Sequence, residues 1–163
     1  MEDVGSVVAF WALAVVTLGA ALVTALVRDL VRAVVALVVS FLGVAGLFVL
    51  LSADFLGVAQ ALIYAGAISV LIVFAIVLTP RAARDNAETG MRWPALVLAG
   101  ALAGLVIAVA VATDWGDGAR EGFRETASAI GEALLNRYVL PFEVASVLLL
   151  AAMLGAIVLV RED

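Results

Sequence analysis

The sequence predicts an all-α membrane protein with five transmembrane helices in a single domain, residues 1–163. Two observations predict this class. Hydrophobic residues make up 66% of the chain and the mean hydropathy is +1.25, whereas roughly 45–50% of an ordinary soluble domain is apolar. The apolar residues also form continuous runs instead of alternating with polar ones, which favours helices over the strands of a membrane barrel.

Each predicted span is an apolar run long enough to cross a bilayer, because a hydrocarbon core of about 30 Å needs about 20 helical residues. The first run, between Asp3 and Arg28, is too long for the apolar region of a secretory signal, so we expect a retained helix. The fifth run contains one charged residue, Glu143. The expected spans are about residues 4–27, 33–51, 55–79, 93–113 and 138–160.

Arginine placement predicts the orientation of these spans. Basic residues are enriched in the cytoplasmic loops of membrane proteins, and most of the arginines here fall on one side of the predicted helices. We therefore expect the N-terminus outside and the C-terminus in the cytoplasm. The arginines on the expected cytoplasmic side are Arg28, Arg32, Arg81, Arg84, Arg92 and Arg161, and those on the opposite side are Arg120, Arg124 and Arg137.

Two connections on the expected outer side carry structural signals. The second and third spans are separated by only a few residues, so they form a tight hairpin in which Ser52 or Asp54 is available as an N-cap. The outer loop, residues 114–137, has apolar residues at helical spacing and predicts a short amphipathic helix at the membrane interface. Its apolar residues are Ala127, Ile130 and Leu134, with Thr126 or Ser128 as caps.

The residue types that are missing exclude several classes of site. The chain has no cysteine and no histidine, so it lacks the usual protein ligands of iron–sulfur clusters, haem and most zinc sites, and the commonest catalytic base. All nine basic residues are arginine, so no Schiff-base or P-loop lysine exists. We expect no metal, no bound cofactor and no catalytic residue in this chain, and no nucleic acid among its partners.

Small residues recur at helical spacing in three spans. In the third span, Gly57, Ala61, Ala65 and Ser69 follow at intervals of four, and such a strip allows another helix to approach closely. The fourth span has Gly100 and Gly104, and the fifth has Gly155. Packing within a helix bundle is the favoured interpretation for each strip taken alone.

The third span also carries polar groups at depth. Tyr64 lies ten residues beyond Asp54, about 15 Å into the membrane, and Gln60 lies one turn before it. These two side chains either hydrogen-bond to a neighbouring helix or line a proton or water path. Gly66 weakens the helix in its middle and suits either close packing or a π-bulge, a local widening with i→i+5 hydrogen bonds.

Glu143 opens the fifth span, shortly after Pro141, which is well placed in the first turn of a helix. A carboxylate near the N-terminus of a helix interacts favourably with the helix dipole, so an interfacial structural role is favoured for Glu143. A role in proton relay is the alternative.

Two stretches carry a resemblance to a known family. "FLGVAQALIYAGAISVLIVFAIVL" from Phe55 to Leu78 and "NRYVLPFEVASVLLLAAMLGAIVL" from Asn136 to Leu159 closely resemble the J-type subunit of proton-pumping NADH:quinone oxidoreductase, respiratory complex I. The mitochondrial counterpart is the sixth membrane-encoded chain. The resemblance extends over the whole chain in order, length and five-helix layout, but its specific residues lie in these two stretches.

The resemblance implies a multi-pass subunit of the bacterial plasma (inner) membrane that has no redox centre of its own. NADH, FMN, iron–sulfur clusters and quinone belong to the complex as a whole. The implied partners are the K-type and A-type subunits, the quinone-site H-type subunit and the antiporter-like pumps. Carried over by position, Tyr64, Ala65, Gly66 and Ala67 form a π-bulge that rearranges during turnover, and Gln60, Ser69 and Glu143 are polar path or helix-contact residues.

We expect this chain to help couple quinone reduction to proton pumping through a conformational change of its third helix. Two alternatives remain at this stage. One is a small subunit of a related cation/proton antiporter or membrane hydrogenase complex, and the other is a purely structural scaffold subunit.

Overall fold

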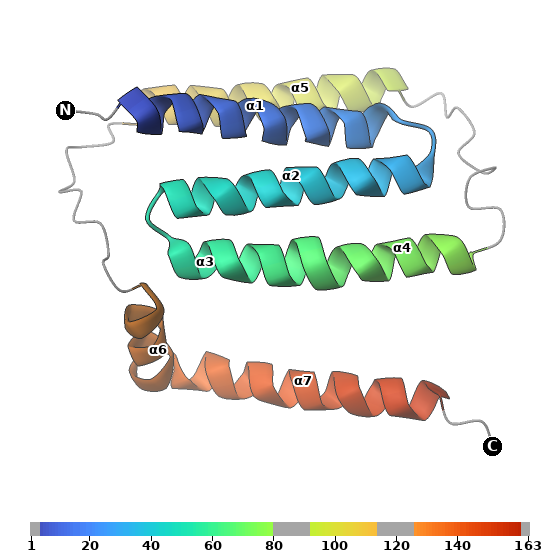
Figure 1. Ribbon diagram of the computed structural model, residues 1–163, viewed down its shortest axis with the longest axis vertical. Helices are drawn as coiled ribbons and strands as arrows, with labels where there is room; N and C mark the ends of the chain where they lie inside the picture. The colour runs from blue at the N-terminus through green and yellow to red at the C-terminus, as the bar shows by residue number, and fades with distance from the viewer. Residues whose placement is uncertain (1–3, 80–91, 114–125, 161–163) are drawn as a thin grey trace.

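The computed structural model describes residues 4–79, 92–113 and 126–160, and these residues are almost entirely helical (Figure 1). Five helices are long and apolar enough to cross a membrane. The expectation of an all-helical chain with five spans of this kind is therefore confirmed for the described residues.

The first two spans are α1 (Val4–Leu26) and α2 (Leu30–Leu50). α2 begins three residues earlier than the charge pattern predicts, because Asp29 caps it. The Asp29 carboxylate accepts hydrogen bonds from the backbone N–H groups of Val31 at 3.0 Å and Arg32 at 3.2 Å. An N-cap of this kind satisfies backbone donors that have no partner within the helix, so Arg32 lies inside α2 and not before it.

The third span runs over Asp54–Leu78 and contains α3 (Asp54–Ala59), η1 (Gln60–Ile68) and α4 (Ser69–Leu78). The turn before it is closed by the backbone, since the Ala53 N–H donates to the Phe48 carbonyl at 2.8 Å and Ser52 has a left-handed φ of 60°. The expectation that Ser52 or Asp54 caps this helix is wrong. Ala53 is the N-cap residue and makes no side-chain hydrogen bond.

The remaining helices are α5 (Arg92–Ala112), α6 (Thr126–Asn136) and α7 (Val139–Val160). The short helix expected within residues 114–137 is present as α6. The two expected caps, Thr126 and Ser128, both lie inside α6. The Thr126 hydroxyl oxygen reaches another element, where it accepts a hydrogen bond from the Phe55 N–H at 3.4 Å. This contact joins α6 to the start of α3.

α2 lies at the centre of a layer formed by the first three spans (Figure 1). It packs against α1 on one side and against α3, η1 and α4 on the other. In the described part of the chain, α7 comes close only to α6, and α5 comes close to no other helix. The ends of the described chain at Val4 and Val160 lie at opposite ends of the structure, as an odd number of spans requires (Figure 1).

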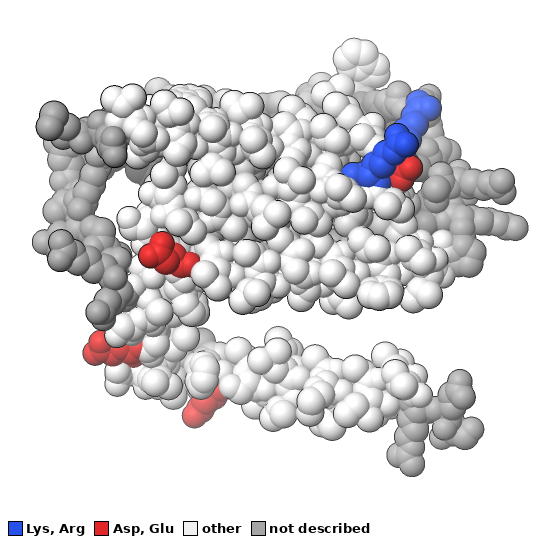
Figure 2. Space-filling model, in the orientation of Figure 1, with Lys and Arg blue, Asp and Glu red and all other residues white. Residues whose placement is uncertain are grey.

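The surface of the described residues is apolar along the length of the spans and charged near their ends. Figure 2 shows basic side chains together with an acidic one at one end, further acidic side chains at the other, and an uncharged band between them. Large apolar side chains in the band are exposed, such as Leu148 at 70% and Leu159 at 88%. Exposed apolar surface on this scale fits lipid or other membrane helices, and not water.

α1 approaches α2 closely because α2 has glycines at the contact. A Cβ atom added at Gly43 would collide with the Thr17 hydroxyl, and one added at Gly46 would lie 2.9 Å from Leu13 Cδ2. The Ser40 hydroxyl donates to the Thr17 carbonyl at 3.2 Å across the same contact. Small residues and an interhelical hydrogen bond thus replace the hydrophobic effect, which is weak between helices in a membrane.

Gly43→Ala is expected to destabilise the α1–α2 pair by about 1–3 kcal/mol, because the added methyl group overpacks the contact with Thr17. The measurement is thermal unfolding of the purified chain in detergent, followed by circular dichroism. Adding Thr17→Ala to the same chain removes the colliding atom and should restore most of the stability. Gly19→Ala is the control, because a Cβ there meets nothing within 4 Å; equal loss at both glycines would contradict the packing argument.

Candidate functional site

The third span changes from α to π geometry at Gln60 and returns to α geometry at Ser69. A π-helix closes its hydrogen bonds from residue i to residue i+5, one residue more than an α-helix. All four residues expected in a bulge, Tyr64 to Ala67, lie within the π-helix η1. Ala59 and Ser69 at its two ends have ordinary α-helical backbone angles, so the span continues as a helix on both sides.

The π geometry brings two distant small residues to the same face. Gly57 and Ser69 are twelve residues apart, which places them about 120° apart around a regular α-helix. One extra residue in a π-helical turn reduces the angle between Gly57 and Ser69 by about 100°. Both residues are buried in the structure, and α2 packs along this whole span. The strip of small residues expected from the sequence therefore faces α2 at both ends because the helix between them is widened.

Ser69 is the most deeply buried side chain among the described residues, with 2% of its surface exposed. Its hydroxyl donates to the Tyr64 carbonyl at 2.8 Å. The Ser69 backbone N–H points to the same carbonyl, which is the i→i+5 bond that ends the π-helix. The hydroxyl and the backbone N–H of Ser69 therefore both donate to the Tyr64 carbonyl.

Tyr64 anchors the π-helix to α2 through its ring. The Tyr64 and Phe41 rings meet edge to face, with centroids 5.6 Å apart and planes inclined by 71°. Such a pair stabilises by about 0.5–1.5 kcal/mol beyond the apolar area it buries. The Tyr64 side chain still has 46% of its surface exposed within this chain, so it also faces outward, towards lipid or a neighbouring subunit.

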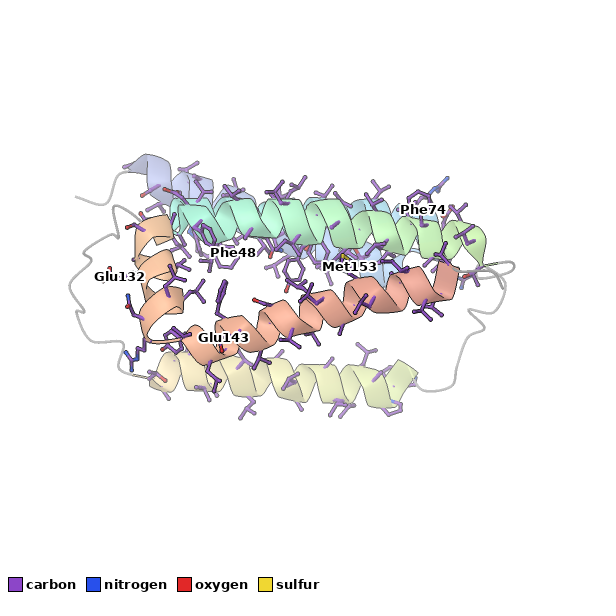
Figure 3. All side chains as sticks on the ribbon, turned by 90° about the horizontal axis from the view of Figure 1, so that it is seen from below. Phe48, Phe74, Glu132, Glu143 and Met153 are labelled. Atoms are coloured by element: carbon purple, nitrogen blue, oxygen red, sulfur yellow. The ribbon has the colours of Figure 1, made fainter. Side chains whose placement is uncertain are left out.

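The structure separates Glu143 from the other polar residues selected from the sequence. Gln60 begins the π-helix and is half-buried, about one turn before Tyr64, and Ser69 follows directly after the π-helix in the same span. Glu143 is exposed and is the fifth residue of α7, beyond its first turn. Figure 3 shows it on the side of α7 that faces away from the layer of α2, α3 and α4. Within this chain Glu143 cannot share a polar path with Tyr64.

The glycines expected to pack helices together divide into two groups. Gly57 is a close contact, because a Cβ there would lie 2.7 Å from Val49 Cγ2 and 3.1 Å from the Ala45 carbonyl oxygen. At Gly66 a Cβ would meet only the Ala61 carbonyl oxygen, at 3.5 Å, so close packing within this chain does not require the glycine. Three further glycines have nothing within 4 Å of an added Cβ, namely Gly100, Gly104 and Gly155.

The sequence analysis missed the residues that hold α1 against α2. Ser40, Gly43 and Gly46 recur at intervals of three along α2, and this spacing was the available signal. Among the described residues, no three His, Cys, Asp or Glu side chains gather closely enough to hold a metal ion.

Comparison with known proteins extends the resemblance over almost the whole chain. Residues 7–159 match the family of NADH-ubiquinone/plastoquinone oxidoreductase chain 6. The chain belongs to this family. The resemblance to J-type subunits inferred from the sequence is therefore confirmed, and with its five apolar helices the chain is a multi-pass membrane protein.

Relatives from three organisms cover nearly all of the chain. NAD(P)H-quinone oxidoreductase chain 6 of Synechocystis is 41% identical over 162 residues, which cover 96% of this chain and 81% of the relative. F(420)H(2) dehydrogenase subunit J of Methanosarcina mazei is 37% identical over 158 residues, which cover 94% and 90%. NADH-quinone oxidoreductase subunit J of Rhodobacter capsulatus is 36% identical over 166 residues, which cover 94% and 80%.

Gly57→Ala is expected to destabilise the hairpin of α2 and α3 by about 1–3 kcal/mol, because the Ala45 carbonyl oxygen belongs to the backbone and cannot move aside. Gly66→Ala in the same span should leave the hairpin intact, since its Cβ makes only an ordinary contact. Thermal unfolding of the purified chain in detergent measures both variants. A larger loss at Gly66 than at Gly57 would show that the packing of α2 is not the controlling contact.

Proposed function

We propose that this chain is a coupling subunit of a proton-translocating quinone oxidoreductase complex. It carries no electrons and transmits a conformational change from the site of quinone reduction to the subunits that move protons. The single observation behind this proposal is the π-helix over Gln60–Ile68 in the middle of a membrane span. A π-helix is rare and less stable than an α-helix, and single-turn π-bulges occur frequently at functional sites.

The proposed mechanism is an exchange of the third span between π and α geometry. Removing the extra residue from the helical ring turns α4 by about 100° relative to α3. Such a turn changes which side chains meet the neighbouring subunits. An equilibrium of this kind shifts only when the neighbours contact the two forms differently, so the surrounding subunits supply the driving force.

Tyr64 of η1 faces both α2 of this chain and the surroundings of the chain. Its ring contacts Phe41 of α2, and its exposed part is available to a neighbouring subunit or to water in a proton path. We assign Gln60 and Ser69 to the same region, Gln60 at the first residue of η1 and Ser69 directly after its last. Glu143 faces away from that region, and we assign it a contact with another subunit near the membrane surface.

The partners proposed are the K-type and A-type subunits, the quinone-site H-type subunit and the antiporter-like subunits. The small-residue strips at Gly100, Gly104 and Gly155 suit contacts with helices of these subunits, because a Cβ there has no neighbour within 4 Å among the described residues. The location proposed is a bacterial plasma membrane. The arginine distribution supports an outer N-terminus and a cytoplasmic C-terminus.

The reaction of the whole complex is the transfer of electrons from a reduced donor to quinone. FMN and iron–sulfur clusters are assigned to other subunits, because this chain has no cysteine or histidine to hold a cluster. NADH is the proposed donor. A relative named F(420)H(2) dehydrogenase is almost as similar as those named for NAD(P)H, so a subunit of this type serves complexes with more than one donor.

Deleting Ala67 removes one residue from the widened ring and is expected to convert the third span to a continuous α-helix. The complex should assemble and still oxidise NADH with quinone, while the number of protons moved per electron falls by at least half. Proton uptake by inverted membrane vesicles during NADH oxidation measures this ratio. Gly66→Leu is a second variant that should lower the same ratio without a deletion.

The corresponding deletion control is a variant lacking Ala108 in α5, which is α-helical throughout. If the Ala67 deletion and Gly66→Leu both assemble and pump with an unchanged ratio, the third span has no part in coupling. The chain would then be a structural scaffold of the complex.

A further inference from the structure

Ser69 differs from the other hydroxyl residues that bond to the backbone of their own helix. Five serine and threonine hydroxyls within the described helices or directly after their last residue donate to the carbonyl four residues earlier, as is usual in α-helices. Ser69 donates to the carbonyl five residues earlier, at 2.8 Å, so its side chain follows the π register. The five others are Thr17, Thr24, Thr79, Thr113 and Ser146.

Each register of the third span presents a different set of α4 side chains to α2. The close contact at Gly57 holds α3 in place, and each residue turns the helix by about 100°. Because the π form contains one extra residue per turn, every residue of α4 is turned back by this angle. Each residue of α4 in the π form therefore points in the direction that the preceding residue takes in the α form. The buried or half-buried residues of the π form are Ser69, Ile72 and Ile76. In the α form the corresponding positions belong to Ile68, Leu71 and Ala75.

The side chain at the first of these positions determines which set, and therefore which form of the third span, packs better against α2. In the π form this position holds Ser69, a small residue of which only 2% of the surface is exposed. In the α form the same position receives Ile68. Forcing additional methyl groups into a well-packed contact is costly, so the contact with α2 disfavours the α form.

We infer that the pair Ile68 and Ser69 sets the register of the third span, with Ser69 as the positioning residue that favours the π form. Its small side chain fits against α2 only in this form, and its hydroxyl accompanies the backbone bond to Tyr64. On conversion to the α form, Ser69 turns away from α2 and the hydroxyl exchanges the Tyr64 carbonyl for that of Ala65. The consequence for proton transport rests on the proposed function, but the register does not.

The test exchanges the two residues without changing composition, by combining Ile68→Ser with Ser69→Ile in the complete complex. The small residue then faces α2 in the α form, so the α form should become the majority. Electron cryomicroscopy of the purified complex shows which register the backbone of residues 60–69 follows. Ser69→Ala should keep the π form, because alanine is equally small, and this variant separates size from hydrogen bonding.

The matched control exchanges two residues that belong to neither set, Val77→Leu with Leu78→Val; they are 68% and 76% exposed, and the exchange should leave the π form unchanged. Ile68→Ala adds no volume and protects the test against failure to assemble. It should raise the ratio of α to π about tenfold, equivalent to about 1.4 kcal/mol. A π form that is undiminished in both the exchange variant and Ile68→Ala overturns the inference.

The same variants distinguish this inference from the proposed function. If the exchange variant adopts the α form and still moves the normal number of protons per electron, Ser69 sets the register but the register does not couple quinone reduction to pumping. If both the exchange variant and Ile68→Ala stay in the π form, the inference about Ser69 fails while the proposed coupling role is untouched.

Discussion

The close approach of α2 to both neighbouring helices is the contact on which the rest of this structure depends. Helices in a membrane gain little from burying apolar surface against one another, because lipid tails are equally apolar. Contact distance therefore decides which helices associate. Gly43 allows α1 to approach α2, and Gly57 allows α3 to approach it from the other side. Among the described residues, most of the buried ones lie in α2 for this reason.

Maintaining that approach along the whole third span conflicts with regular helix geometry. A strip of small residues at intervals of four drifts around an α-helix by about 40° at each step. From Gly57 to Ser69 this drift would turn the strip away from α2, and the widened π segment corrects it. Tyr64 lies in the corrected segment and keeps its ring against Phe41. The packing of the third span therefore depends on its unusual geometry, because the π-helix permits continuous contact with α2.

Local sequence signals were sufficient for the spans but not for their precise starts. Charge-free runs predicted both ends of α7 to within one residue. α2 begins three residues before its predicted start, because Asp29 caps the helix and Arg32 lies inside it. Gly66 lies within the π-helix of the third span. Choosing between close packing and a π-bulge there required the position of α2, which no local pattern contains.

Tertiary placement also explains what the sequence could not provide for the candidate site. Glu143 and Tyr64 both stand out as polar residues in apolar spans, and a sequence gives no information about which way α7 faces. The structure turns Glu143 away from the third span (Figure 3). Ser69 was selected only as a small residue and a polar candidate. Its bond to the carbonyl five residues earlier depends on a backbone geometry that spacing alone does not define.

The few contacts that α5 and α7 make within this chain affect its stability before assembly. In the described part of the chain, α5 comes close to no other helix and α7 only to α6. We therefore expect the other subunits of the assembly to fix the positions of these two helices. The stability of such a chain then depends on the supply of its partners. In copies made in excess of the partners, α5 and α7 should stay undocked, and we expect such copies to be degraded faster than assembled ones.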